Sequence, residues 1–277
     1  MGILEEVAAI LEDMMGRELE GLRIERLVVG LFFTGVKLSN GAGGICYTPV
    51  KEIPQAVCCP SSAGRIFDPR NIRGSSVREV LSALASPEPM KGAVVVSTLN
   101  ALSSTFWEGD RGRPHEIQIN KDVLDLIDFS PERSVALIGA MVPVLRSLKV
   151  RGGRWWVVEK DPRTLRGEEI DHFVPADQCS DVIGQADILV ITGVTILNRS
   201  LEPILDMARR DAEIAVVGPT ASMLPDPIFD RGVKMVGGVW VKQPDDLLDL
   251  LSMGASGYHF FDTLADRIVI KNPKANA

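Results

Sequence analysis

The sequence has few residues of the kinds that build metal sites. Its 277 residues include three histidines and four cysteines. The histidines, His115, His172 and His259, are far apart, and neither H-x-x-x-H nor H-E-x-x-H nor C-x-x-C occurs. Because a local metal site needs ligands at short, regular spacing, a metal site here would have to be assembled from distant residues. The adjacent Cys58 and Cys59 are open to two interpretations, a soft-metal pair or two small residues that finish a strand.

Other classes of function lack their sequence signatures. There is no G-x-S-x-G elbow and no G-K-[ST] phosphate loop. The formal net charge is −7 and no dense Lys/Arg block occurs, whereas nucleic-acid phosphates require clustered cations. No apolar run reaches about 18 residues, and the acidic start M-G-I-L-E-E lacks the basic region of a signal peptide. We therefore expect a cytoplasmic protein with reduced cysteines that binds neither nucleic acid nor membrane.

The N-terminal part of the sequence alternates between helical and strand patterns. Residues 3–19 have apolar residues at helical spacing, whereas residues 24–39 are rich in β-branched and aromatic residues, interrupted by two glycines. The pair Asn40-Gly41 is a strong hairpin signal. Residues 77–85 and 91–104 have helical patterns. The sequence predicts an α+β domain over residues 1–129, with either two strands or one bulged strand in 24–39.

A different pattern begins at residue 134, where short apolar strands alternate with helices. Such strands, buried on both faces, are typical of a doubly wound, mostly parallel sheet with helices on either side, so we predict an α/β domain over residues 130–277. The expected strands are 135–138, 155–158, 188–191, 214–217 and 233–236. The expected helices are 142–148, 178–184, 201–209, 225–229 and 245–251.

The ends of these strands are where a ligand is expected. In an open doubly wound sheet, ligands bind beyond the carboxyl ends of the strands, near the point where the strand order reverses. Most of these ends carry glycines or small polar residues, and the second carries an acid. The candidate ligand-binding residues there are Gly139, Ala140, Met141, Glu159, Asp161, Thr192, Gly193, Thr195, Gly218 and Pro219. Gly237 and Gly238 are expected to follow the fifth strand.

The spacing between the first two ends suggests a class of ligand. Glu159 lies 20 residues after Gly139, the separation at which an acid accepts ribose hydroxyls in dinucleotide folds. Met141 and Pro143 occupy the turn in place of further glycines, which argues against a dinucleotide pyrophosphate and favours a small nucleoside-like or anionic ligand. The alternative is that Gly139 only makes a tight turn and Glu159 is a solvated charge. Thr192–Thr195 either holds a carboxylate or phosphate, or caps a helix.

Two further residues are candidates. Asn100 is a lone amide in an apolar helical run, so it either caps a neighbouring segment or faces a cleft. His259 follows a glycine-rich stretch and precedes Asp262, and is either a structural histidine or a metal ligand. Glu159 and His259 are the two candidate metal ligands.

The order of several short motifs resembles a prokaryotic heavy-metal chelation family. The motifs are V-A-L-I-G-A-M-V-P, V-V-E-K-D-P, A-D-I-L-V-I-T-G-V-T-I-L-N, V-V-G-P-T-A-S-M-L-P-D and V-G-G-V-W-V, preceded by G-L-F-F-T-G-V and S-T-L-N-A-L. The resemblance covers about residues 10 to 270. It implies a domain similar to the N-terminal domain of enolases, then a Rossmann-like domain, with a site between them. Asn100, Gly139, Glu159, Thr192, Gly193, Thr195, Gly218 and Pro219 match the family's pattern by position.

Three hypotheses of function follow. The first is a metal-handling protein that binds a divalent metal or small ligand in the cleft between its domains, either chelating directly or helping to make a chelator. The second is an enzyme that uses a nucleoside cosubstrate, such as S-adenosylmethionine or a nucleotide, gripped by Glu159. The third is a non-catalytic sensor or scaffold. A homo-oligomer is compatible with all three.

Overall fold

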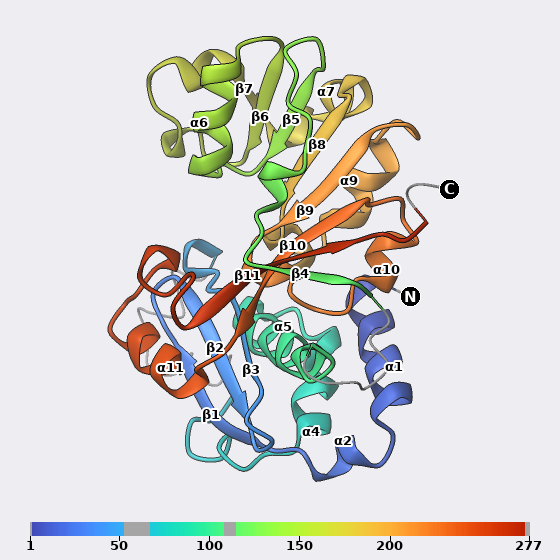
Figure 1. The fold of residues 1–277 in the computed structure, drawn as a ribbon. Coiled ribbons are helices and arrows are strands. Elements are labelled where there is room, and N and C mark those ends of the chain that lie inside the picture. The colour runs from blue at the N-terminus through green and yellow to red at the C-terminus, as the bar shows by residue number, and fades with distance from the viewer. Residues whose placement is uncertain (1, 53–66, 108–114, 275–277) are drawn as a thin grey trace.

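The computed structural model describes residues 2–52, 67–107 and 115–274, which form two β-sheets with helices around them (Figure 1). The predicted Cys58-Cys59 pair lies outside the described residues. The helices are α1 (Ile3–Met15), α2 (Glu18–Gly21), α4 (Val77–Leu81), α5 (Pro89–Ser104), α6 (Val142–Arg151), α7 (Ser180–Gln185), α8 (Val194–Leu197), α9 (Leu201–Met207), α10 (Asp226–Phe229) and α11 (Pro244–Ser252). No described helix is long and apolar enough to cross a membrane.

The small sheet is an antiparallel meander of β1 (Ile24–Val29), β2 (Phe33–Leu38) and β3 (Gly43–Tyr47). Residues 24–39 therefore form two strands, and the predicted hairpin at Asn40-Gly41 is confirmed, with Gly41 at φ +87°. The helix predicted over 3–19 ends earlier, at Met15, because Gly16 adopts φ +51° and turns the chain into α2.

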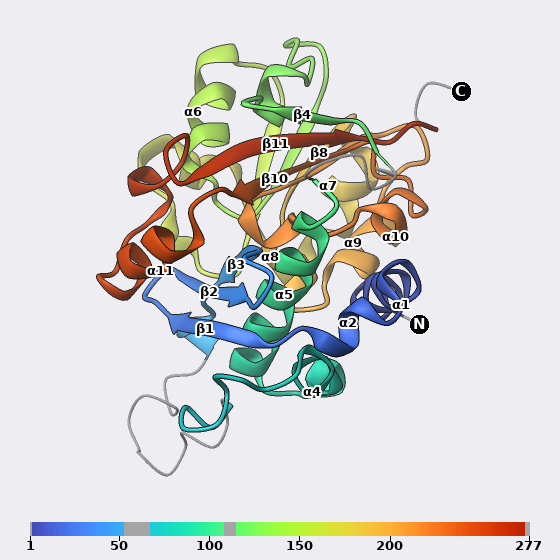
Figure 2. The ribbon, with the colours of Figure 1, turned by 60° about the horizontal axis from the view of Figure 1, so that its bottom comes forward.

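Helices cover both faces of the small sheet. Nearly all of α5 is buried, and it lies against β2 and β3 with α1 and α4 on its other side (Figure 2). The approach is close, since a Cβ on Gly44 would lie 2.2 Å from the Ser97 carbonyl oxygen. On the opposite face, Leu248 and Leu251 of α11 fill the space left by the missing side chain of Gly35. The small sheet is thus held between one early and one late helix.

The large sheet has eight strands in the order β4-β11-β10-β9-β8-β5-β6-β7. Its six parallel strands, taken in chain order, lie in the spatial order 3-2-1-4-5-6, which is that of the Rossmann fold. The predicted α/β class with a mostly parallel sheet is confirmed. The strands are β4 (Ile117–Ile119), β5 (Val135–Ile138), β6 (Trp155–Glu159), β7 (Phe173–Pro175), β8 (Ile188–Thr192), β9 (Glu213–Val217), β10 (Met235–Val241) and β11 (Ala265–Lys271).

One strand boundary corrects the sequence prediction. Gly237 and Gly238 were expected after a strand ending at residue 236, but they lie inside β10, paired with β9 and β11. The reason is packing. A Cβ on Gly238 would lie 2.8 Å from Oγ of Ser222, which accepts the Val239 N–H at 2.9 Å. Gly238 thus lets the turn after β9 approach β10, and Gly237 makes room for Val123, whose Cγ2 would lie 2.8 Å from a Cβ at that position.

Candidate functional site

The predicted residues of the first and third strand ends meet at the point where the strand order reverses. This point lies between β5 and β8, which are neighbours in the sheet although two strands separate them in sequence. Gly139 follows β5 with φ +90°, and a Cβ there would lie 2.7 Å from Cγ2 of Thr192. The two turns therefore touch, as expected at the switch point of a doubly wound sheet.

The turn after β5 is closed by Glu159 from the end of β6. One carboxylate oxygen, Oε2, accepts the Ala140 N–H at 3.0 Å, and the other accepts the Lys160 and Asp161 N–H groups at 2.8 and 3.4 Å. A carboxylate has about four positions for hydrogen-bond donors, so three are already occupied. Glu159 therefore lies beside the turn after β5, as the spacing predicts. Its carboxylate, however, accepts backbone N–H groups of the protein, including the Ala140 N–H of this turn.

Two neighbours of this turn have local partners. The Met141 N–H donates to the Gly139 carbonyl at 2.9 Å, and Met141 precedes the first residue of α6. Asp161 accepts the Arg163 backbone N–H at 3.1 Å and its Nε–H at 2.8 Å. The Arg163 guanidinium lowers the pKa of Asp161 to about 2. Lys51, from the 3₁₀ turn Val50–Glu52, lies 3.6 Å from Asp161 and links the N-terminal part to this side.

The turns after β8 and β9 lie against each other. The Gly193 N–H donates to the Val217 carbonyl at 2.8 Å, and a Cβ on Gly193 would lie 3.0 Å from the Ala221 nitrogen. Thr195 Oγ1 donates to the Thr192 carbonyl at 2.7 Å, so this hydroxyl stabilises its own turn. Gly218 adopts φ +121° and leads into the 3₁₀ turn Pro219–Ala221.

Asn100 on α5 connects the small sheet to this second pair of turns. Its Nδ2 amide donates to the carbonyls of Ile45, Pro219 and Thr220 at 2.7, 3.2 and 3.3 Å. Asn100 is 1% exposed, and its Oδ1 is buried without a hydrogen-bond partner. Of the two interpretations of Asn100, the contacts match the cap of a neighbouring segment. The unpartnered oxygen leaves one acceptor available for a donor.

Two residues at this edge, Tyr47 and Cys46, were not predicted as site residues. The Tyr47 N–H, at the end of β3, donates to Oγ1 of Thr220 at 3.1 Å. The phenol of Tyr47 is half-buried, and burial, followed by the charges of Glu52 and Glu159, raises its pKa. Burial also raises the pKa of the Cys46 thiol, against a hydrogen bond with Thr220. The sequence signal was weak, because Tyr47 and Cys46 lie in β3 of the small sheet, far in sequence from the strands of the large sheet that were used to locate the site.

His259 has its contacts elsewhere. It ends the 3₁₀ turn Gly257–His259 and is exposed, and its Nδ1 lies 3.0 Å from the Ser256 nitrogen. The next residue, Phe260, packs on Phe33 of β2 with ring centroids 5.6 Å apart. Within the described ranges, no group of three or more His, Cys, Asp or Glu side chains is placed to hold a metal ion.

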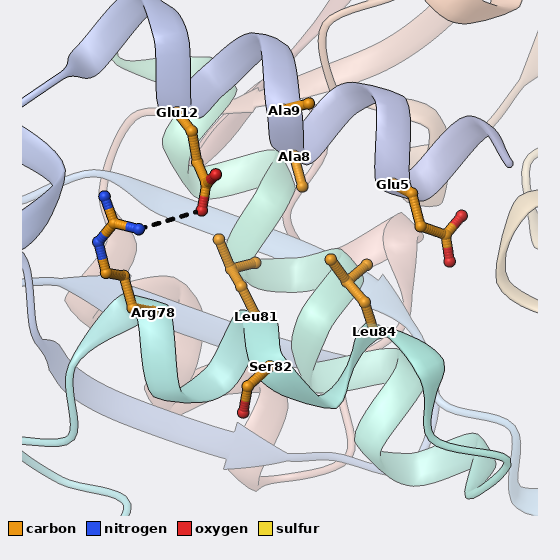
Figure 3. A pocket seen from close by; sticks show the side chains of 8 residues that line it. All are labelled: Glu5, Ala8, Ala9, Glu12, Arg78, Leu81, Ser82 and Leu84. Carbon is orange, nitrogen blue, oxygen red and sulfur yellow. Dashed lines mark hydrogen bonds and ion pairs between the residues drawn. The ribbon is translucent and has the colours of Figure 1, made fainter. Parts of the chain in front are cut away.

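Two surface hollows lie away from the turns after β5, β6, β8 and β9. One, of about 370 Å³, lies between α1 and the segment Arg78–Leu84, where Glu12 pairs with Arg78 at 3.4 Å (Figure 3). The other, of about 280 Å³, is lined by Asn40, Trp240 and Lys242 among others. Neither is lined by a residue from the turns after β5, β6, β8 or β9, so the candidate site is defined by the contacts among its own residues.

Comparison with known proteins adds the family. Residues 122–270 match the family model described as "Putative heavy-metal chelation", and residues 12–103 match a second model with the same description. The chain belongs to this family. An uncharacterized protein of Methanocaldococcus jannaschii is 25% identical over 190 residues, which are 67% of this chain and 68% of that protein.

Two solved structures of proteins of unknown function from the same family share the fold. The protein from Pyrococcus horikoshii aligns with a TM-score of 0.76 at 22% identity, covering 97% of this chain and 99% of its own. The protein from Desulfitobacterium hafniense aligns with a TM-score of 0.71 at 15% identity, with the same coverage of both chains. Both descriptions give no function and no ligand, so these likenesses concern the fold alone.

Proposed function

We propose that this protein handles metals through a small organic ligand bound at the carboxyl edge of the large sheet. The ligand lies between the turns after β5, β6, β8 and β9 and the segment Tyr47–Glu52. The observation that carries the proposal is the buried, unpartnered Oδ1 of Asn100, beside the turn that this residue holds. A buried polar atom without a partner is rare in native proteins and fits a site completed by a bound molecule or water.

The state of the carboxylates supports a ligand that brings its own metal donors. Glu159 is bound by three backbone amides, and Asp161 is bound by Arg163. Carboxylates that ligate a metal must offer oxygens to it, whereas these oxygens are largely occupied. A chelator, its precursor or its metal complex supplies those donors instead, which agrees with the family description.

A nucleoside-type cosubstrate is the second candidate. It is favoured by the strand order 3-2-1-4-5-6 together with an acid at the end of the second strand of that order. In this alternative, Glu159 offers its remaining acceptor position to one ribose hydroxyl. The protein is then an enzyme, and chelator synthesis would unite it with the first candidate. A sensor or scaffold remains the interpretation if a ligand binds without being converted.

The test is a thermal-shift and calorimetry series on metal-stripped protein. The probes are Zn²⁺, Ni²⁺, S-adenosylmethionine and ATP, alone and in pairs with a metal. A ligand that binds only the folded state raises the midpoint, and the rise grows with the logarithm of the ratio of its concentration to Kd. We expect an organic probe to raise the midpoint and a metal to add to it only in that probe's presence. If the metal alone shifts the midpoint as much as it does in the presence of the probe, the protein chelates the metal directly.

A pair of matched variants locates the site. Glu159→Gln removes the charge at the first turn and should weaken binding of a hydroxyl-bearing ligand about tenfold, the effect of losing one charge-assisted hydrogen bond. Glu168→Gln makes the same change at an exposed carboxylate of residues 167–172 and should leave affinity unchanged. Equal affinities of both variants would remove Glu159 from the ligand site.

A further inference from the structure

A group of exposed apolar side chains lies where the β1–β2 turn meets the segment after α11. Its members are Val29 (44% exposed), Leu31 (58%), Phe32 (44%), Met253 (73%) and Tyr258 (80%). The turn touches the last turn of α11, from which the second segment continues, because a Cβ on Gly30 would lie 2.6 Å from the Leu251 carbonyl oxygen. We call these five side chains the apolar tip. Single exposed apolar residues are ordinary, but a cluster from two touching segments marks an interaction surface.

The apolar tip is free of charge. Residues 27–36, L-V-V-G-L-F-F-T-G-V, and residues 252–261, S-M-G-A-S-G-Y-H-F-F, contain no Asp, Glu, Lys or Arg. The chain as a whole carries a net charge of −7, so two copies repel each other at long range. The electrostatic repulsion between two copies is smallest if they meet through surfaces that carry no charge. A basic partner, in contrast, would be drawn to the acidic residues elsewhere on the surface.

The tip continues a strand edge that is largely unpaired among the described residues. β1 is the edge strand of the small sheet, and its outer side is bonded at Ile24, to Gly74 and Ser75. From Arg26 to Val29, its ladder in the described residues is with β2 alone. Leu27 and Val28 are partly exposed, and Val29 is exposed. Arg26 on this edge is paired with Asp245 and Asp249 of α11, whereas Leu27–Val29 is apolar. An apolar edge is a template for pairing with another strand.

We propose that the apolar tip and the outer edge of β1 form the contact between two copies of this chain. Related by a two-fold axis, two β1 strands run antiparallel, and the same residues face one another from both sides. The tip is also joined to the candidate site, since the Thr48 N–H donates to the Phe32 carbonyl at 3.0 Å and Tyr47 pairs with Phe33. The second copy therefore lies next to the Tyr47 side of that site. The proposal does not depend on the proposed function.

Light scattering coupled to size-exclusion chromatography, with sedimentation equilibrium, tests this on the full chain. Wild type should be a dimer at micromolar concentration. Phe32→Glu and Leu31→Glu should raise the dimer dissociation constant at least about 100-fold, since each places like charges opposite one another. Val150→Glu is the matched control. Val150 is 90% exposed on α6, remote in sequence from both segments of the tip, and its variant should remain dimeric.

Circular dichroism and thermal melting of each variant establish that it is folded, which is expected because the replaced side chains are exposed. A wild type that is still monomeric at about 100 μM would overturn the proposal, because this protein concentration exceeds the dissociation constant of a stable dimer. So would a Phe32→Glu variant as dimeric as wild type. Flotation with phosphatidylcholine vesicles forms a further arm. Monomeric protein that floats through the apolar tip would show a membrane contact in place of the dimer.

Discussion

The two sides of the switch point satisfy their polar groups in different ways. After β5 and β6, backbone amides are bound by Glu159 and Asp161 is bound by Arg163, all within about 25 residues of sequence. After β8 and β9, the turn Pro219–Ala221 is held by Asn100 and Tyr47, which lie more than 100 residues earlier. The first side is closed by its own residues. The second depends on the small sheet and α5 for its shape.

This difference bears on where a ligand acts. A turn whose hydrogen bonds are local keeps its shape without help, because few long-range contacts must form first. A turn held across two sheets changes shape when the sheets move, and Asn100, which holds this turn from α5, has a buried Oδ1 that lacks a partner. We therefore expect the second side to be the more sensitive one, both to mutation and to ligand.

The largest effect should come from breaking the link on the second side. Asn100→Ala leaves the carbonyls of Ile45, Pro219 and Thr220 without their amide donor in a buried place. Buried polar groups that lose a partner cost about 1–3 kcal/mol each, so we expect a loss of about 3 kcal/mol in the free energy of unfolding. Urea denaturation measures it.

Asn71→Ala is the control for this substitution. Asn71 is exposed, and its amide makes one long contact with Asp68, at 3.4 Å. An exposed change of this kind should cost less than about 0.5 kcal/mol. If the two alanine variants unfold at the same urea concentration, the connection through Asn100 contributes nothing, and the comparison between the two sides fails.

The same comparison separates what the sequence could and could not predict. Four of the five expected strand ends, the Asn40-Gly41 hairpin and the nearness of Glu159 to the first turn depend on local patterns and spacing, and these were predicted. The partners of Asn100 were not, because a buried amide gives no sign in sequence of which carbonyls it will meet. β4 has three residues, too few for a pattern, and the glycines inside β10 resemble a strand end until Ser222 is seen packed on Gly238.

An intermediate effect should come from Gly139, where the two sides touch. Gly139→Ala forces a Cβ onto a residue at φ +90° and against Cγ2 of Thr192 at 2.7 Å. Together, strain and overpacking should lower the free energy of unfolding by about 2 kcal/mol. Adding Thr192→Ser, which removes that methyl group, should restore part of the loss in urea denaturation.

Gly152→Ala isolates the strain in this experiment. Gly152 also has a positive φ, +68°, but a Cβ there meets no atom within 4 Å. The free energy of unfolding should therefore fall less in Gly152→Ala than in Gly139→Ala, and the difference is the contribution of the contact with Thr192 Cγ2. If the two losses are equal and Thr192→Ser rescues nothing, then the turns after β5 and β8 do not press on each other as the structure has them.

The smallest effect should come from the first side, where Asp161 has its local partner. Because the Arg163 guanidinium lowers the pKa of Asp161 to about 2, below its ordinary value, the carboxylate stabilises the fold above pH 4. That stabilisation is lost as the pH falls towards 2. Asp161→Asn should flatten this part of the dependence of the thermal midpoint on pH, whereas Asp125→Asn, at an exposed carboxylate, should not.

Lys51→Met tests whether the first side depends on the small sheet, since Lys51 contacts Asp161 from the small-sheet side. A pH profile changed as much by Lys51→Met as by Asp161→Asn would mean that this side, too, depends on the other layer.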